Sequence, residues 1–159
     1  MINPPNSKRS ISLVLFYLAV IAVAAFGVQF QPGEWYVGLQ KSSLTPPNIV
    51  FPIVWTILYA LMPLSIWNIY LKVGGTPAFR FPANLFFIQL GLNGIWTYLF
   101  FGLHRPELAL VDIIVLWVMI LWMIMAYGHV SVRAAALQVP YLLWVTFAAL
   151  LNYQIWVLN

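Results

Sequence analysis

Three short series of residues combine aromatic rings with one small or polar group at helical spacing. Residues three, four or seven positions apart share one face of a helix. If three such faces meet, they enclose an aromatic cavity with a few hydrogen-bonding groups, which is the usual make-up of a small-molecule site. The three series are Trp55, Tyr59 and Met62; Asn93, Trp96 and Phe100; and Pro140, Trp144, Ala148 and Asn152.

A simpler interpretation applies to each tryptophan taken singly. Trp and Tyr are enriched where a membrane meets water, and their neighbours then serve packing alone. Trp55, Trp96 and Trp144 lie several residues inside apolar runs, however, so we favour the cavity for these three.

The residues that usually carry catalysis or bind metals are sparse. His104 and His129 have no second histidine or carboxylate at metal-ligand spacing, and there are no cysteines. No Ser-His-Asp arrangement, glycine-rich phosphate loop or pair of carboxylates is recognisable. The sequence therefore predicts no metal centre, no required cofactor and no familiar catalytic apparatus.

One acidic residue and six amides interrupt apolar stretches. Asp112 lies within two turns of the start of an expected helix, where an acid is either functional or serves as a cap or as a partner of Arg105. The sequence leaves both interpretations of Asp112 open. We expect the amides to form hydrogen bonds between helices; they are Asn68, Gln89, Asn93, Gln138, Asn152 and Gln154.

Composition defines the elements that position these residues. Of 159 residues, 64% are hydrophobic and 6% are charged, which excludes a soluble domain. The net charge of +4 is explained by topology rather than by a nucleic-acid partner. Since about 20 apolar residues cross a bilayer, we predict an all-α integral membrane protein, with one domain over 1–159. Its five transmembrane helices are expected at 10–29, 49–71, 82–103, 107–128 and 134–157.

The distribution of Lys and Arg predicts the orientation of these helices. Five basic residues lie on the side of the N-terminus and two, Lys41 and Arg105, on the other. The N-terminus is therefore expected in the cytoplasm and the C-terminus on the opposite side. The choice between inner and outer membrane stays open. The first apolar run extends past a possible cleavage site at Ala22–Ala24, so we expect a retained helix rather than a signal peptide.

The connection between the first two helices, residues 31–48, differs from an ordinary loop. It carries an acid, Glu34, two aromatic residues, Trp35 and Tyr36, and a base, Lys41. It ends in the rigid pair Pro46-Pro47, which limits how the segment can move. We interpret residues 31–48 as a lid over the predicted cavity and call them the lid segment.

Motifs in the lid segment and in three helices resemble the TspO/MBR family, which includes the mitochondrial translocator protein. The match runs in order through almost the whole chain. It comprises Trp35-Tyr36, Lys41, Pro46-Pro47, Phe51, Val54-Trp55, Leu58-Tyr59, Leu92-Asn93, Trp96, Phe100-Phe101, Pro140-Tyr141, Trp144, Phe147-Ala148, Leu151-Asn152 and Leu158-Asn159.

The resemblance implies a homodimeric five-helix membrane protein that binds porphyrins, with sterols and benzodiazepine-type ligands in animal members. The implied pocket lies between the lid segment and the second, third and fifth helices. Its residues are Trp35, Pro46, Pro47, Phe51, Trp55, Tyr59, Asn93, Trp96, Phe100, Trp144, Phe147, Ala148 and Leu151.

Two positions depart from the family pattern. Ser42 stands where many members have a proline after the lid lysine, which predicts a slightly more mobile lid segment. No basic residue follows Tyr153, so the C-terminal cholesterol motif is absent.

The leading functional hypothesis is a receptor or transporter for protoporphyrin IX or haem. The macrocycle would stack between Trp55, Trp96 and Trp144, with its propionates at Lys41 or Arg105. A second hypothesis is an enzyme that degrades porphyrin in light through Trp55 and Trp144. A third is a regulatory scaffold in the lipid membrane that senses the ligand and acts through partners.

Overall fold

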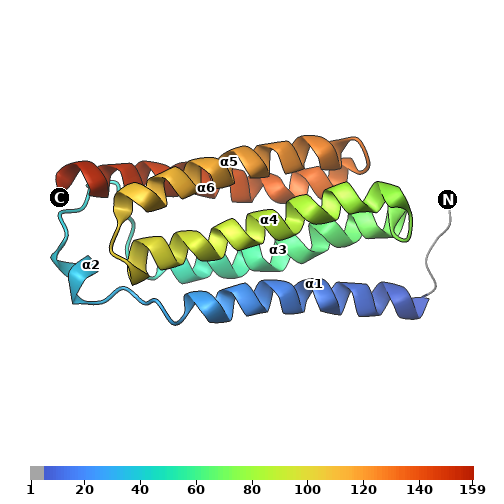
Figure 1. Cartoon of the computed structure of the whole chain (residues 1–159), viewed down its shortest axis with the longest axis horizontal. Coiled ribbons are helices and arrows are strands. Elements are labelled where there is room, and N and C mark those ends of the chain that lie inside the picture. Colours follow the sequence, from blue (N-terminus) through green and yellow to red (C-terminus); the bar gives the residue numbers. More distant parts are fainter. Residues whose placement is uncertain (1–5) are drawn as a thin grey trace.

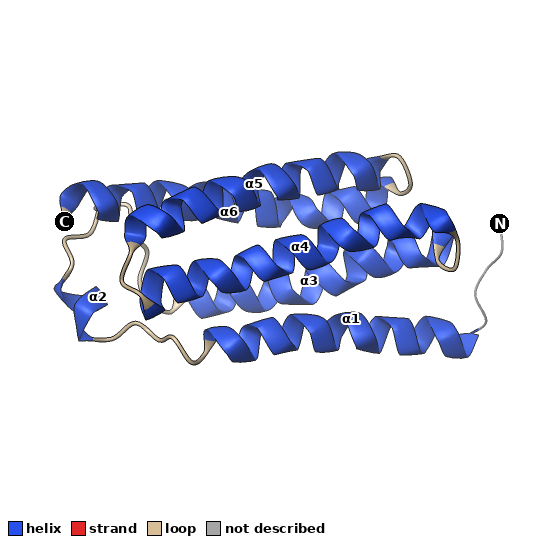
Figure 2. Ribbon diagram, in the orientation of Figure 1, coloured by secondary structure: helices blue, strands red, loops and turns tan. Residues whose placement is uncertain are grey.

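The structure, a computed structural model, describes residues 6–159, and its regular elements are all helices. No strand occurs within that range, which confirms the predicted all-α class (Figures 1 and 2). The helices are α1 (Asn6–Gly27), α2 (Glu34–Gly38), α3 (Val50–Val73), the 3-10 turn η1 (Pro77–Phe79), α4 (Arg80–Thr97), the π-helical turn η2 (Tyr98–Gly102), α5 (Pro106–Gly128) and α6 (Val132–Leu158).

Five helical stretches are long and apolar enough to cross a membrane, as the sequence predicted. They are α1, α3, the continuous run from η1 through η2, α5 and α6. A helix satisfies its own backbone hydrogen bonds, which lipid cannot do. Where the chain leaves a helix it uses residues suited to turns. Gly74 ends α3, and a Cβ atom there would lie 2.3 Å from the carbonyl oxygen of Tyr70.

The long helices form a ring in the order α1, α3, α6, α5, α4. Each packs against its neighbours in that order, whereas α3 and α4, consecutive in the chain, touch each other much less. The largest contacts join α5 to α6 and α4 to α5. Helix α1 packs only on α3 and α4, so most of its surface is left for lipid (Figure 1).

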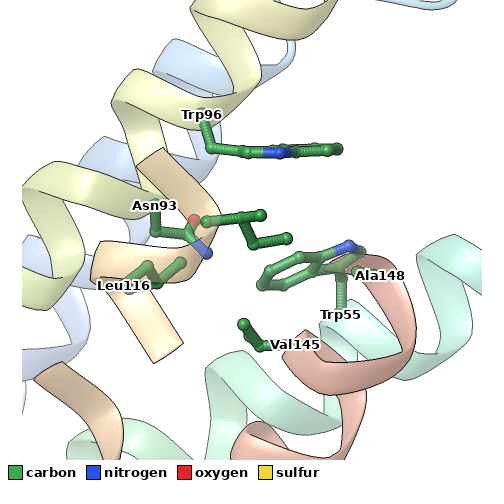
Figure 3. Close-up of a pocket in the computed structure, with 7 residues that line it drawn as sticks. Trp55, Asn93, Trp96, Leu116, Val145 and Ala148 are labelled. Atoms are coloured by element: carbon green, nitrogen blue, oxygen red, sulfur yellow. The ribbon is translucent and has the colours of Figure 1, made fainter. Parts of the chain in front are cut away.

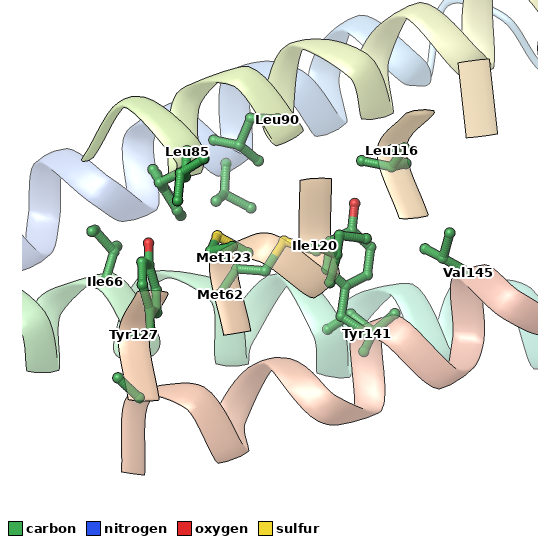
Figure 4. Packing of buried hydrophobic residues seen from close by; sticks show 14 of the residues in the cluster. Met62, Ile66, Leu85, Leu90, Leu116, Ile120, Met123, Tyr127, Tyr141 and Val145 are labelled. Carbon is green, nitrogen blue, oxygen red and sulfur yellow. The ribbon is translucent and has the colours of Figure 1, made fainter. Parts of the chain in front are cut away.

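The two ends of the bundle differ in what they contain. The lid segment, the start of α3, the end of α4, the start of α5 and the end of α6 gather at one end, which we call the lid end (Figure 1). The far end carries the α3–α4 and α5–α6 turns. Toward that end the interior is fully packed (Figure 4); side chains with no exposed surface include Ile66, Ile69, Phe86, Ile120, Met123 and Tyr127.

The predicted lid loop contains one turn of helix, α2. Trp35, Tyr36 and Leu39 pack against a small cluster around Phe100, which explains why this short segment takes up a defined conformation. The π-helical turn η2 turns Phe100 and Phe101 toward the lid segment at the end of α4. Such turns often occur at functional sites.

Candidate functional site

A narrow crevice opens in the bundle interior near the lid end. Its walls come from α3, α4, α5 and α6 (Figure 3). The free space in the crevice is only about 10 Å³, which is room for about one water molecule. The crevice is lined by Trp55, Asn93, Trp96, Ile113, Leu116, Val145 and Ala148.

A chain of hydrogen bonds forms the polar floor of this crevice. The hydroxyl of Tyr59 donates to Oδ1 of Asn93 at 2.9 Å, and Nδ2 of Asn93 donates to the hydroxyl of Tyr141 at 3.2 Å. Asn93 and Tyr141 are buried, so these bonds are shielded from water. They hold the Asn93 side chain in place and tie α3, α4 and α6 together.

Trp96, on the opposite side of the crevice, is held by a second set of contacts. Its Nε1 donates to Oδ1 of Asn152 at 3.0 Å, and Nδ2 of Asn152 donates to the carbonyl of Pro106 at 2.7 Å. The Trp96 ring stacks on Phe100, with 5.1 Å between centroids and 20° between planes. The orientation of Trp96 therefore depends on α5, α6 and η2 together.

The same phenylalanine joins the crevice to the lid segment. Trp35 and Tyr36 both contact the Phe100 ring edge to face, at 5.7 and 6.2 Å between centroids. Trp35 also stacks on His104, with 4.3 Å between centroids and 13° between planes. Phe100 is 2% exposed, so it connects the crevice residue Trp96 to the lid segment through direct ring contacts.

Two further interactions position the lid segment. The side chain of Asn159 pairs with the backbone of Gln40, accepting from its N–H at 2.9 Å and donating to its carbonyl at 3.1 Å. The Lys41 ammonium lies 4.6 Å from the centroid of the Tyr36 ring, within reach of a cation–π interaction. Burial raises the pKa of the Tyr36 phenol, so that ring stays uncharged at neutral pH.

The structure brings four of the thirteen predicted site residues to the crevice: Trp55, Asn93, Trp96 and Ala148. Tyr59 and Phe100 lie directly behind them, bonded to Asn93 and stacked on Trp96. Trp35, Pro46 and Pro47 belong to the lid segment, and Leu151 is buried on α6. The remaining three, Phe51, Trp144 and Phe147, form a separate aromatic group where α3 and α6 meet.

Trp144 is not brought to the crevice beside Trp55 and Trp96. Its ring contacts Phe51 at 5.8 Å and Phe147 at 5.7 Å between centroids. Its buried Nε1 has no hydrogen-bond partner in the described part of the chain. The inward series on α6 includes Tyr141, Val145 and Asn152, whereas Pro140, which we had grouped with Trp144, is exposed.

Three wall residues were not anticipated: Ile113 and Leu116 of α5 and Val145 of α6. Val145 follows Trp144 directly and lies four residues after Tyr141, so correct assignment of the inward face of α6 would have identified it. The only signal for the α5 pair is the neighbouring Asp112, because an acid inside a membrane span usually faces the bundle interior.

The expectation that all six amides bond between helices is confirmed for only two of them; Oε1 of Gln154 is buried without a partner in the described residues. Asn93 and Asn152 do so, but Asn68 donates to the carbonyl of Leu64 in its own helix. Neither polar atom of Gln89 or Gln138 has a partner within residues 6–159. The pairing of Asp112 with Arg105 is also not found, because Arg105 forms its ion pair with Glu107.

The crevice offers stacking surface rather than metal ligands. In the described portion of the chain, no three His, Cys, Asp or Glu side chains come together to hold a metal ion. A bound molecule would contact two indole rings, several aliphatic side chains and the amide of Asn93. Such walls favour a flat, mainly apolar ligand with few polar groups.

Comparison with known proteins finds relatives that match almost the whole chain. The TspO/MBR family model matches residues 12–157. A tryptophan-rich protein TspO of Chlorobaculum tepidum is 41% identical, over 96% of this chain and 99% of its own. A tryptophan-rich sensory protein of Cereibacter sphaeroides is 38% identical, over 93% and 92%. The translocator protein of Homo sapiens is 37% identical, over 89% and 86%.

These matches extend over nearly the whole transmembrane region described above. Together with five helices of membrane-spanning length and composition, they establish an integral, multi-pass membrane protein. The chain belongs to the TspO/MBR family.

Proposed function

We propose that this protein binds a flat tetrapyrrole, protoporphyrin IX or haem, within the helix bundle and transports or senses it. The observation that carries the proposal is the placement of Trp55 and Trp96 on one crevice beneath the lid segment. The names of its relatives, translocator protein and tryptophan-rich sensory protein, support a role in moving or sensing a ligand.

The geometry suggests how each part of such a ligand would be held. The macrocycle would stack on the indole rings of Trp55 and Trp96, and each aromatic contact contributes about 1 kcal/mol beyond burial. Its propionates would remain at the lid end, where Lys41 and Arg105 supply positive charge.

The crevice must widen before a tetrapyrrole can enter. Its free space of about 10 Å³ is far below the roughly 300–1,000 Å³ of pockets that hold drug-sized ligands. The lid segment is the part that can move at least cost. Ring contacts and the Gln40–Asn159 pairing hold it against the bundle, whereas the long helices pack on one another along their length. We therefore propose that the lid segment opens and Trp96 shifts when the ligand binds.

The proposal is tested by quenching of tryptophan fluorescence in detergent, titrated with protoporphyrin IX in the dark. We expect saturable quenching, and about tenfold weaker binding by Trp55→Leu because one stacking surface and its buried area are lost. Trp122→Leu is the matched control, since Trp122 lies on α5 with 48% of its surface exposed and outside the crevice. Equal affinities for wild type and Trp55→Leu would contradict the stacking model.

A second candidate, photochemical degradation of the porphyrin, is favoured by one further observation. Ring contacts run without a break from Trp96 in the crevice through Phe100 to Trp35 in the lid segment. Tryptophan side chains beside an excited macrocycle could supply it with electrons. The same titration repeated in light distinguishes the two functions. Degradation predicts that the porphyrin absorption bands disappear with wild type and persist with Trp55→Leu.

We also propose the orientation predicted from the basic residues, with the N-terminus in the cytoplasm and the lid segment on the opposite side. Since the chain has no cysteine, a single cysteine can be introduced at Ser42 or at Thr76. An impermeant maleimide added to intact cells should label the first and not the second. The reverse pattern would invert the proposed topology.

A further inference from the structure

Asp112 is a buried acid without a partner. It is 8% exposed, and it forms no hydrogen bond or ion pair with any residue of the described chain. Its Oδ2 has almost no accessible surface. An acid inside a membrane is costly unless something compensates it, so its position calls for an explanation.

Two simpler explanations for Asp112, pairing with Arg105 and capping of α5, do not hold. Arg105, the nearest base in sequence, forms its ion pair with Glu107. Asp112 also cannot cap α5, because that helix begins at Pro106 and places Asp112 nearly two turns inside it. Capping side chains act on the first turn, where backbone N–H groups lack partners.

The location of Asp112 connects it to the crevice. It precedes Ile113 directly and lies one turn before Leu116, and both of these line the crevice. Asp112 therefore lies on the stretch of α5 that forms one wall of the crevice.

From this placement we infer that Asp112 is a specificity-determining residue, which selects ligands that carry an N–H or O–H donor. The inference rests on the proposed function to the extent that a flat aromatic ligand enters the crevice. A carboxyl group accepts a hydrogen bond whether or not it is protonated. When the crevice widens, water would satisfy the acceptor until a ligand replaces it.

Selection follows from the cost of leaving Asp112 without a partner. A ligand without a donor would displace that water and bury the acceptor unsatisfied, whereas a ligand with a donor replaces the lost bond. Sites built to hydrogen-bond a ligand group therefore discriminate strongly against analogues that lack it. Protoporphyrin IX carries pyrrole N–H groups, but the test below uses a simpler pair of molecules.

Carbazole and dibenzofuran provide the matched probes, because they share one tricyclic shape and differ in a ring N–H against a ring oxygen. Affinities are measured by equilibrium dialysis of the protein in nanodiscs, with empty nanodiscs as the correction for partitioning into lipid. We expect wild type to bind carbazole about tenfold more tightly than dibenzofuran, as one hydrogen bond to a carboxyl group predicts. In Asp112→Leu the ratio should fall to about one through loss of carbazole affinity.

Two further variants separate recognition from folding. Asp112→Asn keeps an acceptor oxygen and should retain part of the preference for carbazole. Gln89→Leu removes a different unpartnered polar group from the buried interior, outside the crevice, and should keep the wild-type ratio. Helical circular dichroism of each variant verifies that the bundle is formed.

Three outcomes would overturn the inference: a wild-type ratio near one, an Asp112→Leu ratio that stays near tenfold, or no binding of either probe to wild type. Failure of the tetrapyrrole proposal gives a different result. In that case protoporphyrin IX does not bind, while the carbazole preference and its dependence on Asp112 persist.

Discussion

The lid end and the far end of the bundle use the same helices for different purposes. Toward the far end, side chains such as Phe86, Met123 and Tyr127 are completely buried and leave no crevice. The hydroxyl of Tyr127 there donates to the carbonyl of Pro82 at 3.2 Å. Toward the lid end, Trp55 and Trp96 are only half-buried and face open space.

This contrast shows how a membrane protein can have both a fixed scaffold and an adaptable site. Lipid tails are as apolar as the interior, so tight packing and hydrogen bonds, rather than hydrophobic burial, hold the helices together. The far end concentrates that packing. The lid end gives up part of it for a crevice, and hydrogen-bonded amides such as Asn93 and Asn152 maintain its shape.

The largest expected effect is on stability, from a change in the far-end packing. Phe86→Ala removes a ring that packs edge to face against Phe16 of α1, at 5.7 Å between centroids. The cavity left behind should lower the free energy of unfolding by about 3 kcal/mol. Thermal unfolding in detergent measures the loss, and protoporphyrin IX affinity should change by less than about twofold because the crevice is distant.

Its matched control is Phe87→Ala, one position along, where 52% of the side chain faces outward. This change should cost no more than about 0.5 kcal/mol. If the two variants were equally destabilised, the division between a packed far end and an adaptable lid end would not hold.

An intermediate effect is expected at the lid end from Asn152→Leu. This change removes the hydrogen bonds to Trp96 and to the carbonyl of Pro106. Stability should fall by about 1–2 kcal/mol, and protoporphyrin IX affinity about fivefold, because Trp96 loses its orientation. Gln154→Leu, two residues along α6, is the control and should leave the affinity unchanged. An unaltered affinity in Asn152→Leu would show that Trp96 needs no such support.

The smallest effect is expected from Asn159→Ala, which removes the pairing with the backbone of Gln40. Because ring contacts to Phe100 still hold the lid segment, stability should fall by no more than about 1 kcal/mol. Amide hydrogen exchange over residues 34–41 should accelerate severalfold while the α3–α6 helices keep their protection. Val157→Ala, at an exposed position of the same helix, is the comparison; equal exchange in both variants would exclude a role for Asn159 in positioning the lid segment.

The sequence by itself determined the five membrane-spanning helices. Each charge-free run is long enough to cross lipid, where only a helix satisfies its own backbone groups, so the class follows from composition and length. The face shared by Asn93, Trp96 and Phe100 could also be predicted, because spacing fixes which residues of one helix lie side by side. All three point toward the interior in the structure.

Only the tertiary structure decided how each helix is rotated against its neighbours. On α6 the buried residues are Tyr141 and Val145 rather than Pro140 and Trp144, so Val145 lines the crevice beside Ala148 and Trp144 does not. On α5 only Asp112 distinguishes the face of Ile113 and Leu116 from the lipid-facing residues. The physical reason is that lipid and protein interior are both apolar, so polarity does not mark the buried face as it does in water.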